Sequence, residues 1–230
     1  MEGYAATLAL IMVMAASQAS LAQTTRQETE FNATLQAAEQ GDAAAQYKLG
    51  LMYDEGHGGN QDFEKAQAWF RKAAEQGDVT ALFEIGVMYD EGRGVAEDDA
   101  KAYAWYQKAA EQGLAAAQFN LAVMYAEGEG VVQDNDKARA WFQKAAEQGF
   151  AKAQFNLGAM YNGGRGAQKN RVQAYKWFTL SAEQGDRHAG EFCDLLAKGM
   201  TPAQLAEAKR LVAEYKSKRR NAGRGAARKD

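Results

Sequence analysis

Apolar residues recur along the chain at helical spacing, in short segments separated by glycine-rich turns. In one segment, Ala81, Ile85, Met88 and Tyr89 fall at i, i+4, i+7 and i+8. This spacing places the four side chains on one face of an α-helix. The next segment has the same spacing, with apolar positions at Ala102, Trp105, Tyr106, Ala109 and Ala110. The pattern therefore predicts pairs of amphipathic helices.

These helix pairs form a repeat with a period of 36 residues. One set of landmarks is Tyr53, Tyr89, Tyr125 and Tyr161, and another is Trp69, Trp105, Trp141 and Trp177, which includes every tryptophan of the chain. A period of this length is typical of stacked helix pairs, in which each unit contacts its neighbours. We expect the tryptophans to be buried between helices, and the loss of an inner one such as Trp105 to be more damaging than the loss of Trp177.

Turn and cap residues recur at the same period and mark where each helix ends and begins. The first helix of each pair ends at a Gly-x-Gly turn, where glycine can adopt the left-handed conformation. The second helix begins at an acidic or amide N-cap in each copy: Asp62, Asp98, Asp134 and Asn170. Gly50 and Gly158 lie inside the first helices, where glycine is unfavourable, so we expect a partner helix to approach closely there.

The full pattern is Ala-x-x-x-Leu-Gly-x-Met-Tyr-x-x-Gly-x-Gly, followed by Asp-x-x-Lys-Ala-x-x-Trp-Phe/Tyr-x-Lys-Ala-Ala-x-x-Gly. It resembles the Sel-one-like repeat, a relative of the tetratricopeptide repeat, over residues 41–185. The resemblance implies an all-α fold, a right-handed α-α solenoid of four helix pairs with N- and C-terminal capping helices. The copies span residues 42–77, 78–113, 114–149 and 150–185. Departures are local: Gly59 in the first copy, and Leu180 and Ser181 in place of Lys-Ala in the last.

Both flanks of the repeats read as caps. Residues 23–41 can form an N-terminal capping helix, and residues 186–215 C-terminal capping helices. The last helix starts at Thr201 as N-cap, with Pro202 in the first turn and Gln204 completing a capping box. Residues 216–230 are rich in glycine and arginine, and we expect a basic, disordered tail.

The first 22 residues predict a cleavable signal peptide. An uncharged apolar stretch from Ala5 to Ala16 is too short to span a bilayer, and Ser20-Leu21-Ala22 precedes the expected mature start at Gln23. The usual Lys or Arg before the apolar stretch is missing. We therefore expect a periplasmic or secreted protein.

The residue inventory offers little for catalysis. His57 and His188 are the only histidines, far apart and without metal-ligand spacing, and Cys193 is the only cysteine. His57 lies in a turn whose residue varies between copies, which indicates an exposed position. Some Sel-one-like proteins bind or hydrolyse penicillin, but those have a cysteine pair in each repeat. We expect no enzyme, no cofactor and no metal site.

Charge is distributed unevenly between the body and the tail. Residues 23–215 carry 20 basic and 28 acidic residues, whereas residues 216–230 carry seven basic and one acidic residue. An acidic body disfavours nucleic acid as the principal ligand. The tail can give a weak contact with an anionic surface, or it can be a solvated segment.

The resemblance implies that the first helix of each pair lines a concave groove that binds a peptide or protein partner. An aromatic row is expected there, although it could equally serve packing: Tyr47, Phe83, Phe119 and Phe155. The polar neighbours vary between copies and are candidates for specificity: Lys48, Glu84, Asn120 and Asn156.

The sequence thus favours an exported, monomeric interaction scaffold. Two alternatives stay open. One is an enzyme or inhibitor that acts on cell-wall or β-lactam ligands. The other is a structural envelope protein tethered by its basic tail.

Overall fold

The computed structural model describes residue 23, residues 25–57 and residues 59–226. The predicted signal peptide lies outside these residues. Within them the secondary structure is helical without strands, which confirms the all-α class. The chain divides into two compact units, one ending at Asp98 and the other beginning at Asp99. None of the described helices is long and apolar enough to cross a membrane.

The first unit begins with a helix over residues 25–39 and continues with three further helices. These are α2 (Ala43–Glu55), α3 (Phe63–Glu75) and α4 (Val79–Asp90). Consecutive helices pack on one another, α2 on α3 and α3 on α4. The apolar face predicted from the spacing of Ala81, Ile85 and Met88 is fully buried.

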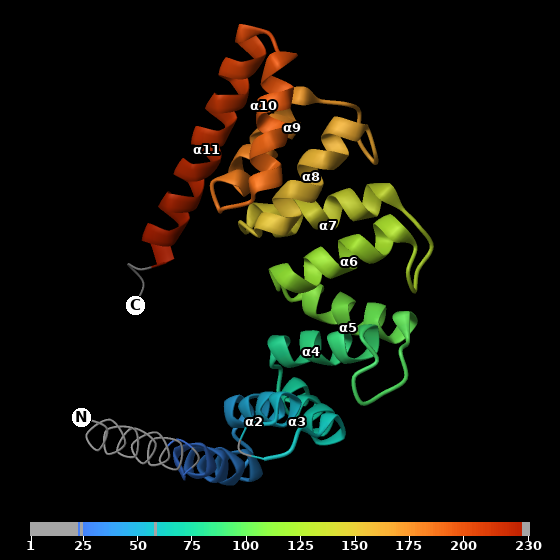
Figure 1. The fold of residues 1–230 in the computed structure, drawn as a ribbon, viewed down its shortest axis with the longest axis vertical. Helices are drawn as coiled ribbons and strands as arrows, with labels where there is room; N and C mark the ends of the chain where they lie inside the picture. Colours follow the sequence, from blue (N-terminus) through green and yellow to red (C-terminus); the bar gives the residue numbers. More distant parts are fainter. Residues whose placement is uncertain (1–22, 24, 58, 227–230) are drawn as a thin grey trace, which may run out of the picture. The chain divides into compact units, whose positions relative to one another are not determined.

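The second unit continues the pattern of paired helices and adds two more (Figure 1). Its helices are α5 (Asp99–Glu111), α6 (Ala115–Glu127), α7 (Asn135–Glu147), α8 (Ala151–Gly163), α9 (Arg171–Ala182), α10 (Arg187–Lys198) and α11 (Pro202–Ala226). Each helix from α5 to α9 packs on the next one, and α11 packs on α9. Consecutive packing of helix pairs is the arrangement that the repeat predicts.

The predicted caps and close approaches are present. Asp62, Asp134 and Asn170 accept hydrogen bonds from first-turn amides of α3, α7 and α9. A Cβ atom on Gly50 would lie 2.5 Å from the Phe70 ring, so only glycine allows this approach without displacing the ring. The same holds for Gly158 against Phe178, at 2.9 Å.

The capping box that begins α11 is also present. The backbone amide of Gln204 donates to Thr201 Oγ1 at 3.2 Å, and the amide of Thr201 donates to Gln204 Oε1 at 2.9 Å. The helix then continues to Ala226, into the segment for which the sequence predicts a disordered tail. Two contacts hold this extension near the repeats: the Tyr215 hydroxyl donates to the Ala146 carbonyl at 2.8 Å, and Lys216 Nζ donates to Glu183 at 2.5 Å.

A hydrogen-bonded pair of one buried and one exposed glutamine recurs in three of the four copies. Gln46, Gln118 and Gln154 each donate from Nε2 to the backbone carbonyl eight residues earlier, at 3.1 Å. The Oε1 atom of each accepts a hydrogen bond from the glutamine thirty residues later, Gln76, Gln148 and Gln184, at 2.7–2.8 Å. These pairs satisfy polar groups inside the stack and fix how the helices are aligned. In the second copy the corresponding residue is Leu82.

The tryptophans are not equally buried, which differs from the sequence-based expectation. Trp177 is 1% exposed, whereas Trp69, Trp105 and Trp141 are only partly buried. The physical reason is that α11 covers the last copy: the Tyr215 ring packs against Trp177 with ring centroids 5.6 Å apart. The expectation that an inner tryptophan matters more than Trp177 is therefore reversed by the burial.

Candidate functional site

The aromatic row predicted to line the groove is partly buried in the structure. Tyr47 on α2 packs on Phe70, with ring centroids 5.7 Å apart. On α6, the Phe119 ring lies 5.7 Å from the Phe142 ring. Phe155 on α8 packs on Phe178 at 5.4 Å, and Phe83 on α4 is also partly buried. One side of these rings therefore contributes to packing, and only the exposed remainder is available to a partner.

The four polar positions beside this row differ in exposure. Lys48 is half exposed, and its Nζ forms an ion pair with Glu30 Oε1 at 2.5 Å. Glu84, Asn120 and Asn156 are partly buried. The ion pair with Glu30 thus restricts the movement of the Lys48 side chain. Partial burial restricts the side chains of Glu84, Asn120 and Asn156.

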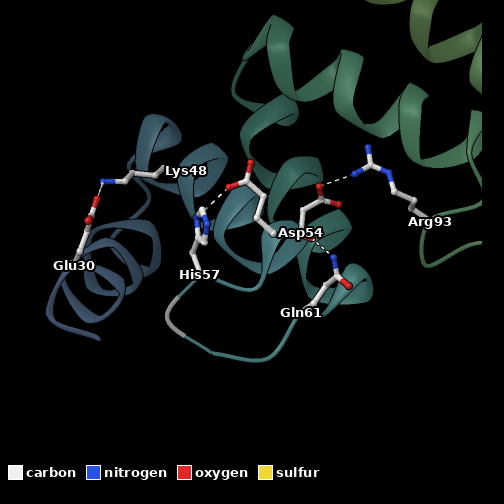
Figure 2. Close-up of polar contacts among 7 residues, drawn as sticks. Glu30, Lys48, Asp54, His57, Gln61 and Arg93 are labelled. Carbon is white, nitrogen blue, oxygen red and sulfur yellow. Dashed lines mark hydrogen bonds and ion pairs between the residues drawn. The ribbon is translucent and has the colours of Figure 1, made fainter. Parts of the chain in front are cut away.

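The first unit has a polar surface formed by Asp54, Glu55, Glu84 and Arg93. At its centre is an ion pair between Asp54 and Arg93 (Figure 2). Asp54 comes from the end of α2, and Arg93 from the turn after α4. Arg93 Nη1 donates to Asp54 Oδ2 at 2.6 Å, and the two side chains are only 26% and 11% exposed. The other carboxylate oxygen of Asp54 is buried without a hydrogen-bond partner among the described residues. Partial burial strengthens this pair relative to an ion pair in water.

Glu84 on α4 adds a partly buried carboxyl group close to this ion pair. Burial raises the pKa of Glu84, and the Arg93 guanidinium opposes that effect. The Asp54 carboxylate contributes to the upward shift of this pKa by repulsion. Burial also raises the pKa of Tyr47 to about 12, with a further contribution from the Glu84 charge. Two predicted site residues from neighbouring helices therefore share one electrostatic environment.

The outer part of the first unit's polar surface is more exposed. His57 Nδ1 lies 3.0 Å from Glu55 Oε2, and the His57 side chain is 59% exposed, as the variable turn position indicates. Gln61 donates from Nε2 to the Asp54 backbone carbonyl at 2.6 Å, which holds the turn after α2 against that helix (Figure 2).

The second unit contains a hollow of 610 Å³ that includes one of the predicted groove residues, Asn156. Of the aromatic residues that line it, Phe192 is partly exposed, whereas Phe142 and Phe178 are only 3% and 0% exposed; Val123 and Asn156 reach the hollow from α6 and α8. Glutamine, asparagine, glutamate and arginine side chains surround these rings: Glu127, Gln133, Asn135, Asn162 and Arg165. Polar side chains therefore provide much of the surface of this hollow, beside the ring of Phe192.

Sequence reasoning did not find the Asp54–Arg93 pair. The turn position of Arg93 is the one that the sequence indicates to be variable and exposed, as at His57 in the first copy. The sequence signal for this pair is the variation of residue type at the turn position, which is His57 in the first copy, Arg93 in the second and Glu129 in the third. A residue type that changes at a fixed repeat position is free of the repeat's packing requirements.

The described residues offer no metal site, since no group of three His, Cys, Asp or Glu side chains is suitably placed. Cys193 is partly buried, with its Sγ atom 3.5 Å from Thr179 Oγ1. Burial raises the pKa of the Cys193 thiol, so it is less nucleophilic than an exposed cysteine.

The repeats of this chain also match a known protein family. Residues 43–78, 79–114, 115–150 and 151–186 each match the family model of the Sel1 repeat. The chain belongs to the Sel1 repeat family. Each Sel1 copy in that match begins one residue later than the boundary derived from the sequence pattern. No curated protein matches the chain.

Two solved Sel1-type structures resemble this one. A protective antigen of uropathogenic Escherichia coli with an SLR fold is 39% identical, with a TM-score of 0.73 over 80% of this chain. A Sel1 repeat protein of Oxalobacter formigenes is also 39% identical, with a TM-score of 0.69 over 74% of this chain. The matches cover 40% and 50% of those two chains, so this chain spans half their length or less.

Proposed function

We propose that this Sel1 repeat protein is a non-catalytic scaffold that binds a peptide segment of a protein partner. The observation that carries the proposal is the 610 Å³ hollow of the second unit, which Asn156 lines together with the partly exposed Phe192. A carboxamide has both a donor and an acceptor, so it can pair with the backbone of an extended peptide. The partly exposed Phe192 ring provides a place for an apolar side chain of that peptide.

The polar surface of the first unit supports the same function with different chemistry. Asp54, Glu84 and Glu55 give it an acidic character that Arg93 only partly neutralises. We propose that this surface favours basic side chains of the partner. The different polar residues at equivalent positions, Lys48, Glu84, Asn120 and Asn156, then give each copy its own preference.

Selection from a peptide library on the full chain tests this function. Peptides selected on the wild type are measured against Asn156→Ala and against the variant with Lys48, Glu84, Asn120 and Asn156 all changed to alanine. We expect weaker binding by Asn156→Ala and a larger loss in the quadruple variant. Asn221→Ala is the matched control, because this exposed asparagine lies on α11 outside the hollow. Equal binding by all four proteins would contradict the proposal.

We also propose that the protein is exported as a monomer that begins at Gln23. The support is the apolar segment and the small residues before that position. The intact mass of the protein recovered from the periplasm or medium tests the cleavage. Full-length protein confined to the cytoplasm would contradict it.

A further inference from the structure

We propose that the cleft between α9 and α11 binds an apolar monocarboxylate, such as an aromatic acid or the C-terminal residue of a peptide. The cleft has a volume of 450 Å³ and lies in the second unit, where α11 packs beside α9 (Figure 1). Its lining residues differ from those of the hollow that contains Asn156. The proposal therefore concerns a second site and can fail independently of the proposed function.

The cleft has an apolar part. Leu211 and Tyr215 of α11 contribute to its lining, and Trp177, which is 1% exposed, packs directly on the Tyr215 ring. The edge-on packing of Tyr215 on Trp177, reinforced by the hydrogen bond of the Tyr215 hydroxyl to Ala146, fixes these walls. A volume of 450 Å³ is within the usual range for small-molecule sites and accommodates a group of the size of an aromatic amino acid.

Lys176 supplies the cation for a carboxylate. Its Nζ lies 4.0 Å from the centre of the Trp177 ring and 5.7 Å from that of Tyr215. Among the described residues, no carboxylate lies within ion-pair distance of this ammonium group. Burial lowers the pKa of Lys176, which shows that water compensates this charge incompletely. A bound carboxylate would provide the missing partner.

The other charges of the cleft favour a single negative charge on the ligand. Lys218 and Arg219 add positive charge, and Glu147 and Glu214 add negative charge. Glu214 already forms an ion pair with Arg210, which leaves the cleft positive on balance. The two glutamates would nevertheless repel a dianion such as phosphate. This balance selects a monocarboxylate.

The test uses the full chain and two acids, 3-phenylpropionate and N-acetyl-phenylalanine, with N-acetyl-phenylalaninamide as the uncharged counterpart. Two-dimensional NMR follows the indole N–H signals of the four tryptophans during titration. We expect either acid to shift the Trp177 signal and to leave Trp69, Trp105 and Trp141 unchanged. Binding of the first acid alone identifies free aromatic acids as the ligands, whereas preference for the second indicates peptide C-termini.

Variants of Lys176 test whether its charge, rather than the folding of the chain, is responsible for binding. Lys176→Gln should weaken binding about tenfold, because a charge-assisted hydrogen bond is lost. Lys176→Arg keeps the charge and should restore most of the affinity. Lys144→Gln is the matched control, since Lys144 lies 3.7 Å above the Trp141 ring outside the cleft. The proposal is overturned if neither acid binds, if the amide binds as tightly as the acids, or if Lys144→Gln weakens binding as much as Lys176→Gln.

Discussion

Leu180 occupies, in the fourth copy, the repeat position at which the other copies place a lysine over their tryptophan. Lys72, Lys108 and Lys144 lie 3.7–4.2 Å above the rings of Trp69, Trp105 and Trp141. Those rings are partly exposed, and the ammonium group of an exposed lysine lies over each one as a cation–π contact. In the fourth copy, Lys176 supplies the ammonium group over Trp177 from the preceding position, α11 also covers that ring, and Leu180 is only 4% exposed. The departure from the repeat pattern thus coincides with the change in what covers the tryptophan.

The first prediction compares two tryptophans of the second unit. Trp177→Ala should lower the free energy of unfolding by ~3–5 kcal/mol, because it removes a fully buried ring. Trp141→Ala should cost less, since that ring is partly exposed. Urea denaturation of both variants measures the difference. Equal losses would mean that the cover provided by α11 adds nothing to stability.

The second prediction concerns Leu180 itself. Leu180→Lys restores the residue type of the other copies, yet it should destabilise the chain by on the order of 3 kcal/mol because an ammonium group would be buried. Leu180→Met, which keeps the volume and polarity, should cost less than about 1.5 kcal/mol. Thermal unfolding of the pair provides the measurement, and a Leu180→Lys variant as stable as the wild type would refute the expectation.

The third prediction tests how α11 is attached. Tyr215→Phe removes the hydroxyl that donates to the Ala146 carbonyl and should cost about 1 kcal/mol. Amide hydrogen exchange in α11 should accelerate at the same time. Tyr161→Phe is the control, because the Tyr161 hydroxyl has no hydrogen bond within the described part of the chain. An equal effect of the two changes would argue against an anchoring role of Tyr215.

The fourth prediction concerns pH and the first unit. Because the folded-state pKa of Glu84 is raised, the folded chain binds this proton more tightly than the unfolded chain does. The contribution of Glu84 is therefore most favourable below its unfolded pKa and is lost as the pH rises through its folded pKa. Glu84→Gln should be more stable than the wild type at pH 7, and the difference should shrink toward pH 4. Thermal unfolding across this range checks the sign, and a gain that grows on acidification would contradict the assignment.

The sequence predicts the helices well because their determinants are local. Periodicity sets the apolar face of α4, and Asp62, Asp134 and Asn170 cap their helices within three residues in the chain. The repeat also reveals close approaches, as at Gly50, because a glycine recurring inside a helix needs a steric reason.

Contacts between distant segments escape such reasoning. Tyr215 reaches Ala146, and Arg93 reaches Asp54, across separations that no periodic pattern encodes. The contact of Tyr215 with Ala146 places α11 over Trp177 and buries it. Because the four tryptophans hold equivalent repeat positions, the sequence could not show which of them is most buried. For the groove, the sequence identified Asn156, which lines the hollow, but it could not tell how far the aromatic row is engaged in packing.

The glutamine pairs bear on how this protein can change over evolutionary time. The same bonds, made by Gln46 with Gln76, Gln118 with Gln148 and Gln154 with Gln184, secure three of the four copies. The hydrogen bonds of Gln118 to the Ala110 carbonyl and of Gln154 to the Ala146 carbonyl cross from one copy to the copy before it. Duplication of one of these copies in the gene would therefore create a junction of a kind that the chain already contains. The number of copies can then change during evolution without new contacts between copies. Point mutations at Lys48, Glu84, Asn120 and Asn156 change the binding preference of each copy separately.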